Sequence, residues 1–256
     1  MLAYLRYKTK NLIYRLATRK VPRTQWDFEV ESAVGYHSQC GQDKFIAERL
    51  KFQRDGVFVD IGANDGVTLS NSYYFEKELC WTGIAVEPLG TAFAKLSQSR
   101  ECQVVHGCIS DVDGEVEFLE CDTYNGMLSG IVSKFHSKQL RTIERARQMH
   151  GGDKRMNRTL SMTPGRLLEK HGIGQIDYLS IDTEGGELDI LRSFDFDDVF
   201  VRLISVENNH HDLTFRNHMQ SCGFDLIAIV GHDEIYENRE KRAGSGEIAP
   251  ASQQAA

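Results

Sequence analysis

The sequence of 256 residues has no run of about 20 apolar residues, the length that a membrane-spanning helix requires. We therefore expect no integral membrane protein of that kind. No apolar core or small-residue cleavage site follows the basic N-terminus, so we also expect no secretory signal and a cytoplasmic protein. The six cysteines form no C-x-x-C pair, which argues against a zinc ribbon or a thioredoxin-like site.

Acidic residues are missing from the first 23 positions, which carry seven lysines and arginines. Because the whole chain has a net charge of −7 and this segment contributes +7, the rest carries −14. Such an acidic body is a poor general binder of nucleic acid, since phosphate contacts need clustered Lys and Arg. We therefore expect no nucleic-acid partner, whereas the basic N-terminus suits an anionic surface.

Residues 1–20 have the apolar periodicity of a helix, and Pro22 ends the pattern. Five apolar residues share one face at 3.6-residue spacing: Leu2, Leu5, Leu12, Ile13 and Leu16. Two interpretations stay open. The helix packs on its own domain or on a second subunit, or it makes a peripheral contact with the acidic inner face of a membrane.

From about residue 36, short apolar segments alternate with helical patterns. Strand-like segments lie at 57–61, 84–86, 103–106, 116–119, 176–181, 203–206 and 224–230. Helix-like segments lie at 69–78, 89–98, 133–149, 163–171, 186–193 and 212–222. This alternation predicts an α/β fold with a doubly wound, mostly parallel sheet and helices on both faces. We expect a basic helix and linker at 1–35, one domain at 36–240 and a disordered tail at 241–256.

Glycines and acids follow the first strand, at the sheet edge where doubly wound folds bind ligands. Residues 60–66 read DIGANDG, and the two glycines allow a tight turn and the close approach of a ligand. Their spacing is not the G-x-G-x-x-G of dinucleotide-binding folds, and Asp60 and Asp65 would repel a pyrophosphate. The loop therefore favours a ligand that has no phosphate or carries positive charge, and it argues against a nicotinamide-dependent oxidoreductase.

The next two strands also end in polar residues. Glu87 follows the second strand, where an acid can accept hydrogen bonds from both hydroxyls of a ribose. Residues 108–111 (CISD) follow the third strand and supply an apolar contact and polar groups that could frame an adenine. Three separate loops thus agree on a nucleoside-like ligand, although each alone is also an ordinary turn.

Four segments carry a resemblance to a known family: VFVDIGANDGVTLSNS (57–72), IAVEP (84–88), IDYLSIDTEGGELDIL (176–191) and SQCGQDKF (38–45). They resemble the FkbM family of S-adenosylmethionine-dependent methyltransferases over about residues 36–230. The resemblance implies a Rossmann-like, seven-stranded sheet whose last strand is antiparallel. It also implies O-methylation of hydroxyl groups, often on sugars, and hence a role in polysaccharide biosynthesis.

The same resemblance implies a set of residues that binds S-adenosylmethionine. They are Gln42, Asp60, Gly62, Asn64, Gly66, Glu87, Ser110 and Asp111. This cofactor has a sulfonium cation and no phosphate, which agrees with the acidic loop.

The candidate catalytic residues follow the strand-like segments 176–181 and 203–206, and they are Asp182, Glu184 and His210. Acids in a first helical turn also stabilise the helix dipole, by about 0.3–1 kcal/mol each, and need no function. Gly185-Gly186 favours a functional role, because glycine is costly in a helix and permits close approach of a ligand. His210 suits a general base. Alternatively, the three side chains hold a divalent cation such as Mg²⁺.

The long polar segment at 121–160 is the expected contact for the acceptor. We expect a hydroxyl on a saccharide, a related small molecule or a glycolipid. The alternative is a catalytically inactive domain that keeps the fold as a binding or scaffold module, because fold alone does not dictate function.

Overall fold

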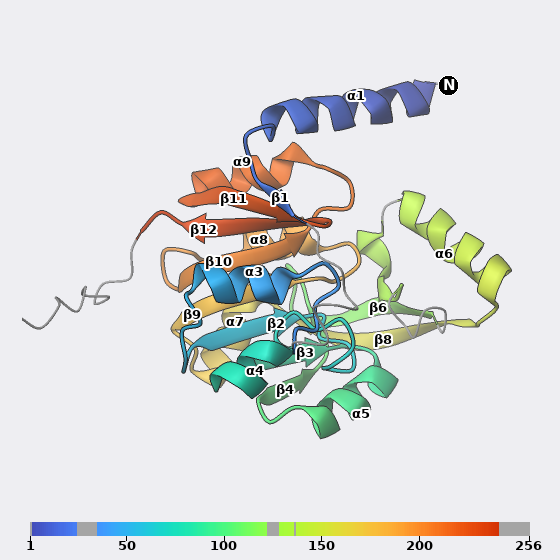
Figure 1. Ribbon diagram of the computed structural model, residues 1–256. Coiled ribbons are helices and arrows are strands. Elements are labelled where there is room, and N and C mark those ends of the chain that lie inside the picture. Colours follow the sequence, from blue (N-terminus) through green and yellow to red (C-terminus); the bar gives the residue numbers. More distant parts are fainter. Residues whose placement is uncertain (1, 25–34, 122–127, 136, 241–256) are drawn as a thin grey trace, which may run out of the picture.

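The computed structural model describes residues 2–24, 35–121, 128–135 and 137–240. A central eight-stranded sheet has the order β1-β11-β12-β10-β9-β2-β3-β4 (Figure 1). Its strands are β1 (Arg23–Thr24), β2 (Val57–Ile61), β3 (Thr82–Glu87), β4 (Gln103–His106), β9 (Gln175–Ile181), β10 (Phe200–Glu207), β11 (Phe224–Val230) and β12 (Asp233–Asn238). Strand β12 is antiparallel to its neighbours β10 and β11, and the other pairs are parallel.

The mostly parallel sheet and its antiparallel last strand agree with the expectation from sequence, but the count of seven strands is wrong. Strand β1 adds an eighth strand at the edge, where Arg23 pairs with Ile229 and Thr24 with Val230. Two residues are too few to show an apolar alternation, so this strand leaves no pattern in the sequence.

Apolar side chains on both faces of the central strands explain why helices cover both sides. Along β2, Phe58 faces one side and Val59 the other, and both are fully buried. Phe58 belongs to the cluster formed with α3 (Gln42–Arg49) and α4 (Tyr73–Leu79). Val59 belongs to the cluster formed with α7 (Pro164–His171), α8 (Glu187–Ser193) and α9 (Leu213–Ser221). Helix α5 (Gly90–Ser99) packs Leu96 against Ala63 and Ala85.

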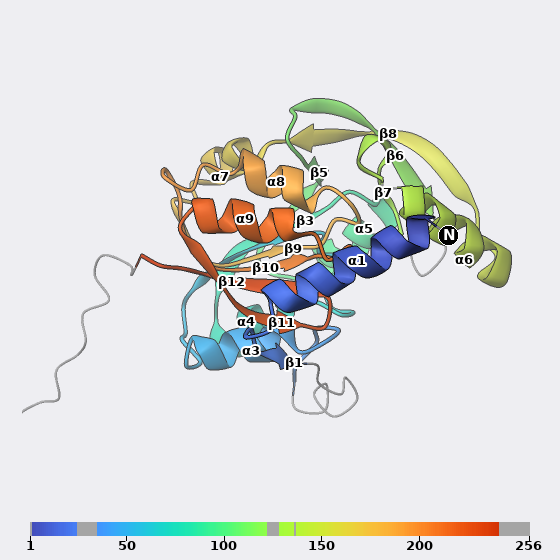
Figure 2. The same ribbon diagram turned by 90° about the horizontal axis from the view of Figure 1, so that it is seen from above.

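A second sheet, which the sequence did not predict, projects from this body. It has the order β5-β8-β6-β7, with β5 (Cys108–Ile109), β6 (Gly114–Cys121), β7 (Gly130–Ile131) and β8 (Lys154–Met162). The short helix η2 (Val132–Lys134) and helix α6 (Ser137–His150) connect β7 to β8. Segment 116–119, expected in the main sheet, therefore lies in this second sheet, which we call the arm together with η2 and α6. Figures 1 and 2 show α6 at its outer end.

Helix α1 (Leu2–Ala17) lies beside α9 and the β11–β12 turn. Tyr14 is 1% exposed, whereas Leu12, Ile13 and Leu16 are 51–59% exposed. The helix thus packs on its own domain through Tyr14, whereas the described part of its apolar face points to solvent. None of the helices in the described ranges has the length and apolar character needed to cross a membrane. The linker residues 25–34 and the expected disordered tail at 241–256 lie outside the described residues.

Candidate active site

A cavity of about 370 Å³ lies at the carboxyl ends of β2, β3, β9 and β10. Sites for small ligands typically have about 300–1,000 Å³, so one small molecule fits here. The cavity lies where doubly wound sheets bind their ligands, because the loops after several parallel strands converge at this edge.

Acidic side chains dominate the described wall of the cavity. Six carboxylates line it: Asp60, Glu87, Asp182, Glu184, Glu207 and Asp233. The lysine among the lining residues, Lys134, is already paired, because its Nζ lies 2.7 Å from a carboxylate oxygen of both Asp111 and Asp189. The cavity therefore favours a cationic ligand and disfavours a phosphate.

Gly62 brings the loop after β2 against the loop after β9. Its φ of +95° is favourable for glycine alone, and a Cβ at this position would collide with the backbone oxygen of Asp182. The backbone N–H groups of Gly62 and Ala63 both donate to the oxygen of Val86, at 3.0 Å. These contacts hold the loop flat against β3, so it forms the floor of the cavity.

Glu87 stands at the end of β3 and is 7% exposed. Its carboxylate accepts hydrogen bonds from the backbone N–H groups of Asn64, at 2.8 Å, and Leu89, at 2.7 Å. Burial raises the pKa of Glu87 to about 7, despite these two bonds. Each oxygen keeps a free lone pair, so the carboxylate can accept two further hydrogen bonds from a vicinal diol.

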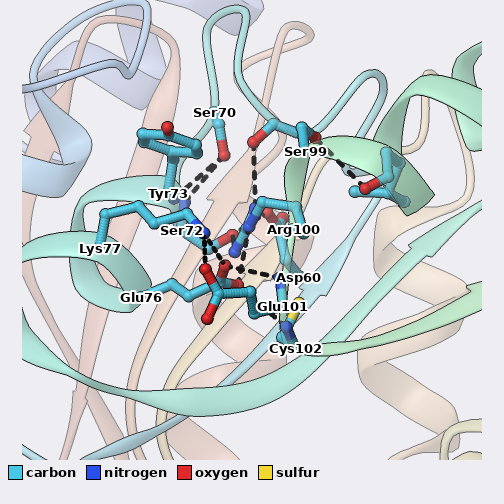
Figure 3. A network of polar contacts seen from close by, with 12 residues as sticks. Asp60, Ser70, Ser72, Tyr73, Glu76, Lys77, Ser99, Arg100, Glu101 and Cys102 are labelled. Carbon is cyan, nitrogen blue, oxygen red and sulfur yellow. Dashed lines mark hydrogen bonds and ion pairs between the residues drawn. The ribbon is translucent and has the colours of Figure 1, made fainter.

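A buried network of hydrogen bonds and an ion pair holds the carboxylate of Asp60 in place (Figure 3). The hydroxyl of Ser72 donates to its carboxylate at 2.5 Å, and Arg100 Nη2 donates to the same Ser72 oxygen at 3.0 Å. Arg100 Nε also pairs with Glu76 at 2.9 Å. Burial raises the pKa of Asp60, while Ser72 and Arg100 oppose that rise. The network fixes the carboxylate at the base of the cavity and limits its repulsion of the other acids.

The structure places most of the expected cofactor residues on the cavity wall: Gln42, Asp60, Gly62, Asn64, Glu87 and Ser110. Gly66 is not among the lining residues, because it packs against Leu96, Ser99 and Arg100. Asp111 is also not among the lining residues, whereas Lys134, with which it forms an ion pair, does line the cavity.

Gln42 holds another acid of the wall in place. Its Oε1 accepts a hydrogen bond from Cys40 N at 2.9 Å, and its side chain hydrogen-bonds Asp233. Burial raises the pKa of Asp233 to about 7, and the bond from Gln42 lowers it in part. Gln42 thus joins the start of α3 to the start of β12.

Asp182, Glu184 and Glu207 bring carboxylate oxygens within 4.8 Å of one another. Burial is the main cause that raises their pKa values, to about 8 for Glu184 and about 9 for Glu207, and neighbouring carboxylates add to the rise. Burial and Glu207 also raise the pKa of Asp182. Such groups can take up a proton near neutral pH or share a cation.

His210, expected beside Asp182 and Glu184, is not among the residues that line the cavity. Glu207 and Asn209, from the same strand end, line it instead. Glu207 ends β10 and therefore points to the same sheet edge as Asp182, whereas His210 follows three residues later in the turn before α9.

Glu187 shapes the turn that carries Glu184. Its carboxylate accepts hydrogen bonds from the backbone N–H groups of Thr183, Gly185 and Gly186, at 2.7–3.3 Å, and from the Thr183 hydroxyl at 3.1 Å. This turn needs positive φ at Glu184 (+57°) and Gly185 (+117°). Glu187 thus positions the candidate catalytic acids.

The arm forms one side of the cavity. Gln139 Nε2 donates to the carboxylate of Glu184 at 3.1 Å, and also to its backbone oxygen. Ser129, Ile131 and Lys134, from the same part of the arm, line the cavity. This placement agrees with the prediction that segment 121–160 contacts the acceptor, which stays a prediction.

A family model described as the methyltransferase FkbM domain matches residues 60–235. The chain belongs to this family. The match begins at Asp60 and ends at Ile235, so it includes all six wall carboxylates of the FkbM domain. No curated protein matches the chain.

Solved structures of other methyltransferases are similar to parts of this FkbM domain. A TehB-like SAM-dependent methyltransferase from Corynebacterium glutamicum is 9% identical over 81% of this chain and 92% of its own, with a TM-score of 0.40. A precorrin-6y C5,15-methyltransferase from Geobacter metallireducens is 12% identical over 72% of this chain and 70% of its own, with a TM-score of 0.36. The N-terminal domain of human METTL16 is 11% identical over 78% of this chain and 67% of its own, with a TM-score of 0.39. With such low identities and TM-scores, these similarities support no statement about the site.

Sequence reasoning missed three contributors to the site of this FkbM domain: Glu207, Asp233 and Gln139. Glu207 could have been predicted, because it is the last residue of an apolar strand. The histidine pair that follows it was the more obvious candidate for a base. Asp233 starts an antiparallel strand, so a rule about the carboxyl ends of parallel strands does not find it. Gln139 lies on α6, which the helix expected at 133–149 matches, but the contact of this helix with Glu184 leaves no pattern in the sequence.

Proposed function

We propose that the chain transfers the methyl group of S-adenosylmethionine to a hydroxyl oxygen of a saccharide, a related small molecule or a glycolipid. The acidic wall of the cavity carries this proposal. Six carboxylates face a volume suited to one small ligand, and the one lysine there is neutralised by two aspartates. A sulfonium cation gains from that field, whereas a pyrophosphate would be repelled.

Glu87 is the proposed partner of the ribose hydroxyls. It has two backbone amides on one side and the cavity on the other, which leaves oxygen lone pairs for a diol. Gly62 and Asn64 would lie beneath the nucleoside, and Ser110 at the end of β5 beside its base. When bound, S-adenosylmethionine supplies the activated methyl group.

Glu184 is the proposed general base, with Asp182 beside it. In the step, the acceptor oxygen forms a bond to the methyl carbon while the carbon–sulfur bond breaks, and its electron pair stays on sulfur. The hydroxyl proton passes to the carboxylate. A base with a pKa of about 8 is well matched to an enzyme that works near neutral pH. Because a sulfonium is already a good leaving group, the chain mainly aligns the two reactants.

Asp182, Glu184 and Glu207 also form an oxygen donor set of the kind that Mg²⁺ takes. A cation there would lower the pKa of the acceptor hydroxyl and keep the three carboxylates ionised. We favour the base, because protonation relieves the crowding of these carboxylates without a metal.

Removing metal ions distinguishes a general base at Glu184 from a bound Mg²⁺. We expect methyl transfer by protein dialysed against EDTA to stay within about twofold of the untreated rate. Added Mg²⁺ should not raise it. A loss of activity that Mg²⁺ restores would transfer the role of Glu184 to the bound cation.

The proposal is tested with isotopically labelled S-adenosylmethionine. Purified protein is incubated with donor and an extract of hydroxylated small molecules, and mass spectrometry identifies the labelled product. Calorimetry with S-adenosylmethionine and with NADH then compares the two cofactor classes. Binding of NADH alone would overturn the proposal. Tight binding of S-adenosylmethionine without any labelled product would favour the inactive scaffold.

A further inference from the structure

Helix α1 presents a strip of large apolar side chains to solvent. Leu12 is 59% exposed, Ile13 51% and Leu16 57%. With about 100° between successive helical residues, Leu12 and Leu16 lie on the side opposite Tyr14, with Ile13 beside them. Exposing three large aliphatic side chains on one helix is costly in water unless something covers them.

The opposite side of α1 is fixed to the domain, so the strip cannot turn inward. Tyr14 donates a hydrogen bond to the buried Glu234 at 2.6 Å and stacks on His211 with ring centroids 4.8 Å apart. Lys10 pairs with Asp212 at 3.0 Å. Arg216 donates to the backbone oxygen of Ala17 at 2.5 Å. These contacts fix the orientation of α1 on the domain, with Leu12, Ile13 and Leu16 facing solvent.

Basic side chains lie close to the strip. Arg15 is exposed beside it on α1, and Arg19 and Lys20 are exposed in the turn that follows the helix. No acid occurs in residues 1–23. An apolar strip accompanied by cations is the pattern of a helix that lies in the headgroup region of an anionic bilayer.

We propose that α1 binds the surface of an anionic lipid bilayer through Leu12, Ile13 and Leu16. The charge favours lipid over a second copy of the chain. A symmetric contact between two copies of α1 would bring two segments of +7 together, whereas anionic headgroups attract them. Each basic residue near such a surface adds roughly 1 kcal/mol.

The position of α1 suits this role. The N-terminal end of α1 reaches past the carboxyl ends of the parallel strands, and α6 reaches past them on the same side (Figures 1 and 2). The N-terminal half of α1 therefore lies on the side of the molecule where the parallel strands end.

Vesicle sedimentation of the full chain tests the proposal. We expect binding to vesicles of phosphatidylcholine with 30% phosphatidylglycerol, taken as roughly the anionic content needed for a strong surface potential. We expect at least about tenfold weaker binding to pure phosphatidylcholine, and a loss on raising the salt that screens the charges. Equal binding to both vesicle types, or none to either, overturns the proposal.

The Leu12→Asn/Leu16→Asn variant should bind anionic vesicles at least about tenfold more weakly, because it removes most of the apolar strip. The matched control is Met156→Asn/Leu160→Asn on the arm, which replaces side chains that are 56% and 64% exposed. The control should bind as the parent does. All four sites face solvent, so circular dichroism should show both variants folded.

Light scattering of the parent without lipid tests the rival occupant. We expect the mass of one chain, 29.0 kDa. A dimer that Leu12→Asn/Leu16→Asn converts to a monomer would assign the strip to a second copy and overturn the proposal. Neither outcome depends on methyl transfer, so the proposed function stands or falls separately.

Discussion

Glu184 changes its protonation state in the range where enzymes work. Burial and the neighbouring carboxylates of Asp182 and Glu187 raise its pKa to about 8, and Gln139 offsets only part of that. The ionised form is the base, so its fraction grows as the pH rises through 8. We predict that kcat rises about tenfold per pH unit below 8 and levels off above it.

Glu184→Gln keeps the shape of the side chain and removes the base. We predict a fall of roughly 10²–10⁴-fold in kcat, the usual contribution of general base catalysis, with S-adenosylmethionine affinity within about threefold. Calorimetry and product assays on the same preparation measure both. A variant whose kcat still rises with pH toward a plateau near 8 would show that another group is the base.

Glu87→Gln tests the donor side. The amide can still accept a hydrogen bond from one backbone N–H, but its NH₂ group cannot accept the second or receive a ribose hydroxyl. We predict about 10–100-fold weaker binding of S-adenosylmethionine in calorimetry, since a hydrogen bond to a charged group contributes about 1.5–3 kcal/mol. Glu117→Gln, on the exposed part of β6, should bind as the parent does.

At the residue scale, the sequence predicted part of the lining of the cavity. Asp60, Gly62 and Glu87 each follow a strand that an apolar run announces, and all three line the cavity. Gln139 contacts Glu184, which lies 45 residues further along the chain, and residue spacing does not reveal such a contact. Gly66 looked like a ligand contact, but its neighbours are the side chains of α5.

Among the elements, α1 depends on one buried contact. Glu234 accepts hydrogen bonds from Tyr14, Tyr236 and Asn208 Nδ2, and it is fully buried. Tyr14→Phe removes one donor and leaves the carboxyl less satisfied. We predict a loss of about 1–3 kcal/mol in the free energy of unfolding, measured in urea. Leu16→Ala, on the exposed side of the helix, should change it by less than about 0.5 kcal/mol.

Elements with a continuous apolar run were predictable, and those without one were not. β2 and β9 are buried on both faces, and their sequences, VFVDI and QIDYLSI, place apolar side chains on both. β8 spans nine residues, of which a single one is fully buried, because the arm extends into solvent. Its sequence therefore reads as a polar loop, and its pairing with β6 comes from the fold alone.

For the whole molecule, the crowded carboxylates link stability to pH. Glu184 and Glu207 have folded pKa values of about 8 and 9, against an ordinary value of 4.5. Between these values the folded chain binds more protons than the unfolded chain, so stability falls as the pH rises. The lowered pKa values of Glu76 and Asp65 act at lower pH and do not oppose this trend.

The lowered pKa values of His171 and His211 oppose this trend only near and below their ordinary value of 6.5. We therefore predict that the Tm of the ligand-free protein falls steadily from pH 7 to pH 9. Glu207→Gln should flatten the slope, because it removes one of the groups that must ionise. Differential scanning calorimetry at each pH provides the measurement. A Tm that rises with pH in this range would contradict the raised pKa values.

The missing side chain at Gly62 bears on how this enzyme could be re-engineered. Since the Asp182 carbonyl fills the space where a Cβ would stand, the donor and acceptor halves of the cavity touch backbone to backbone, with no adjustable spacer between them. Libraries that vary either loop would disturb both halves at once. The arm lines the same cavity with half-buried residues such as Ile131 and Lys134, so the choice of the proposed acceptor is best diversified there while 60–66 and 182–187 stay constant.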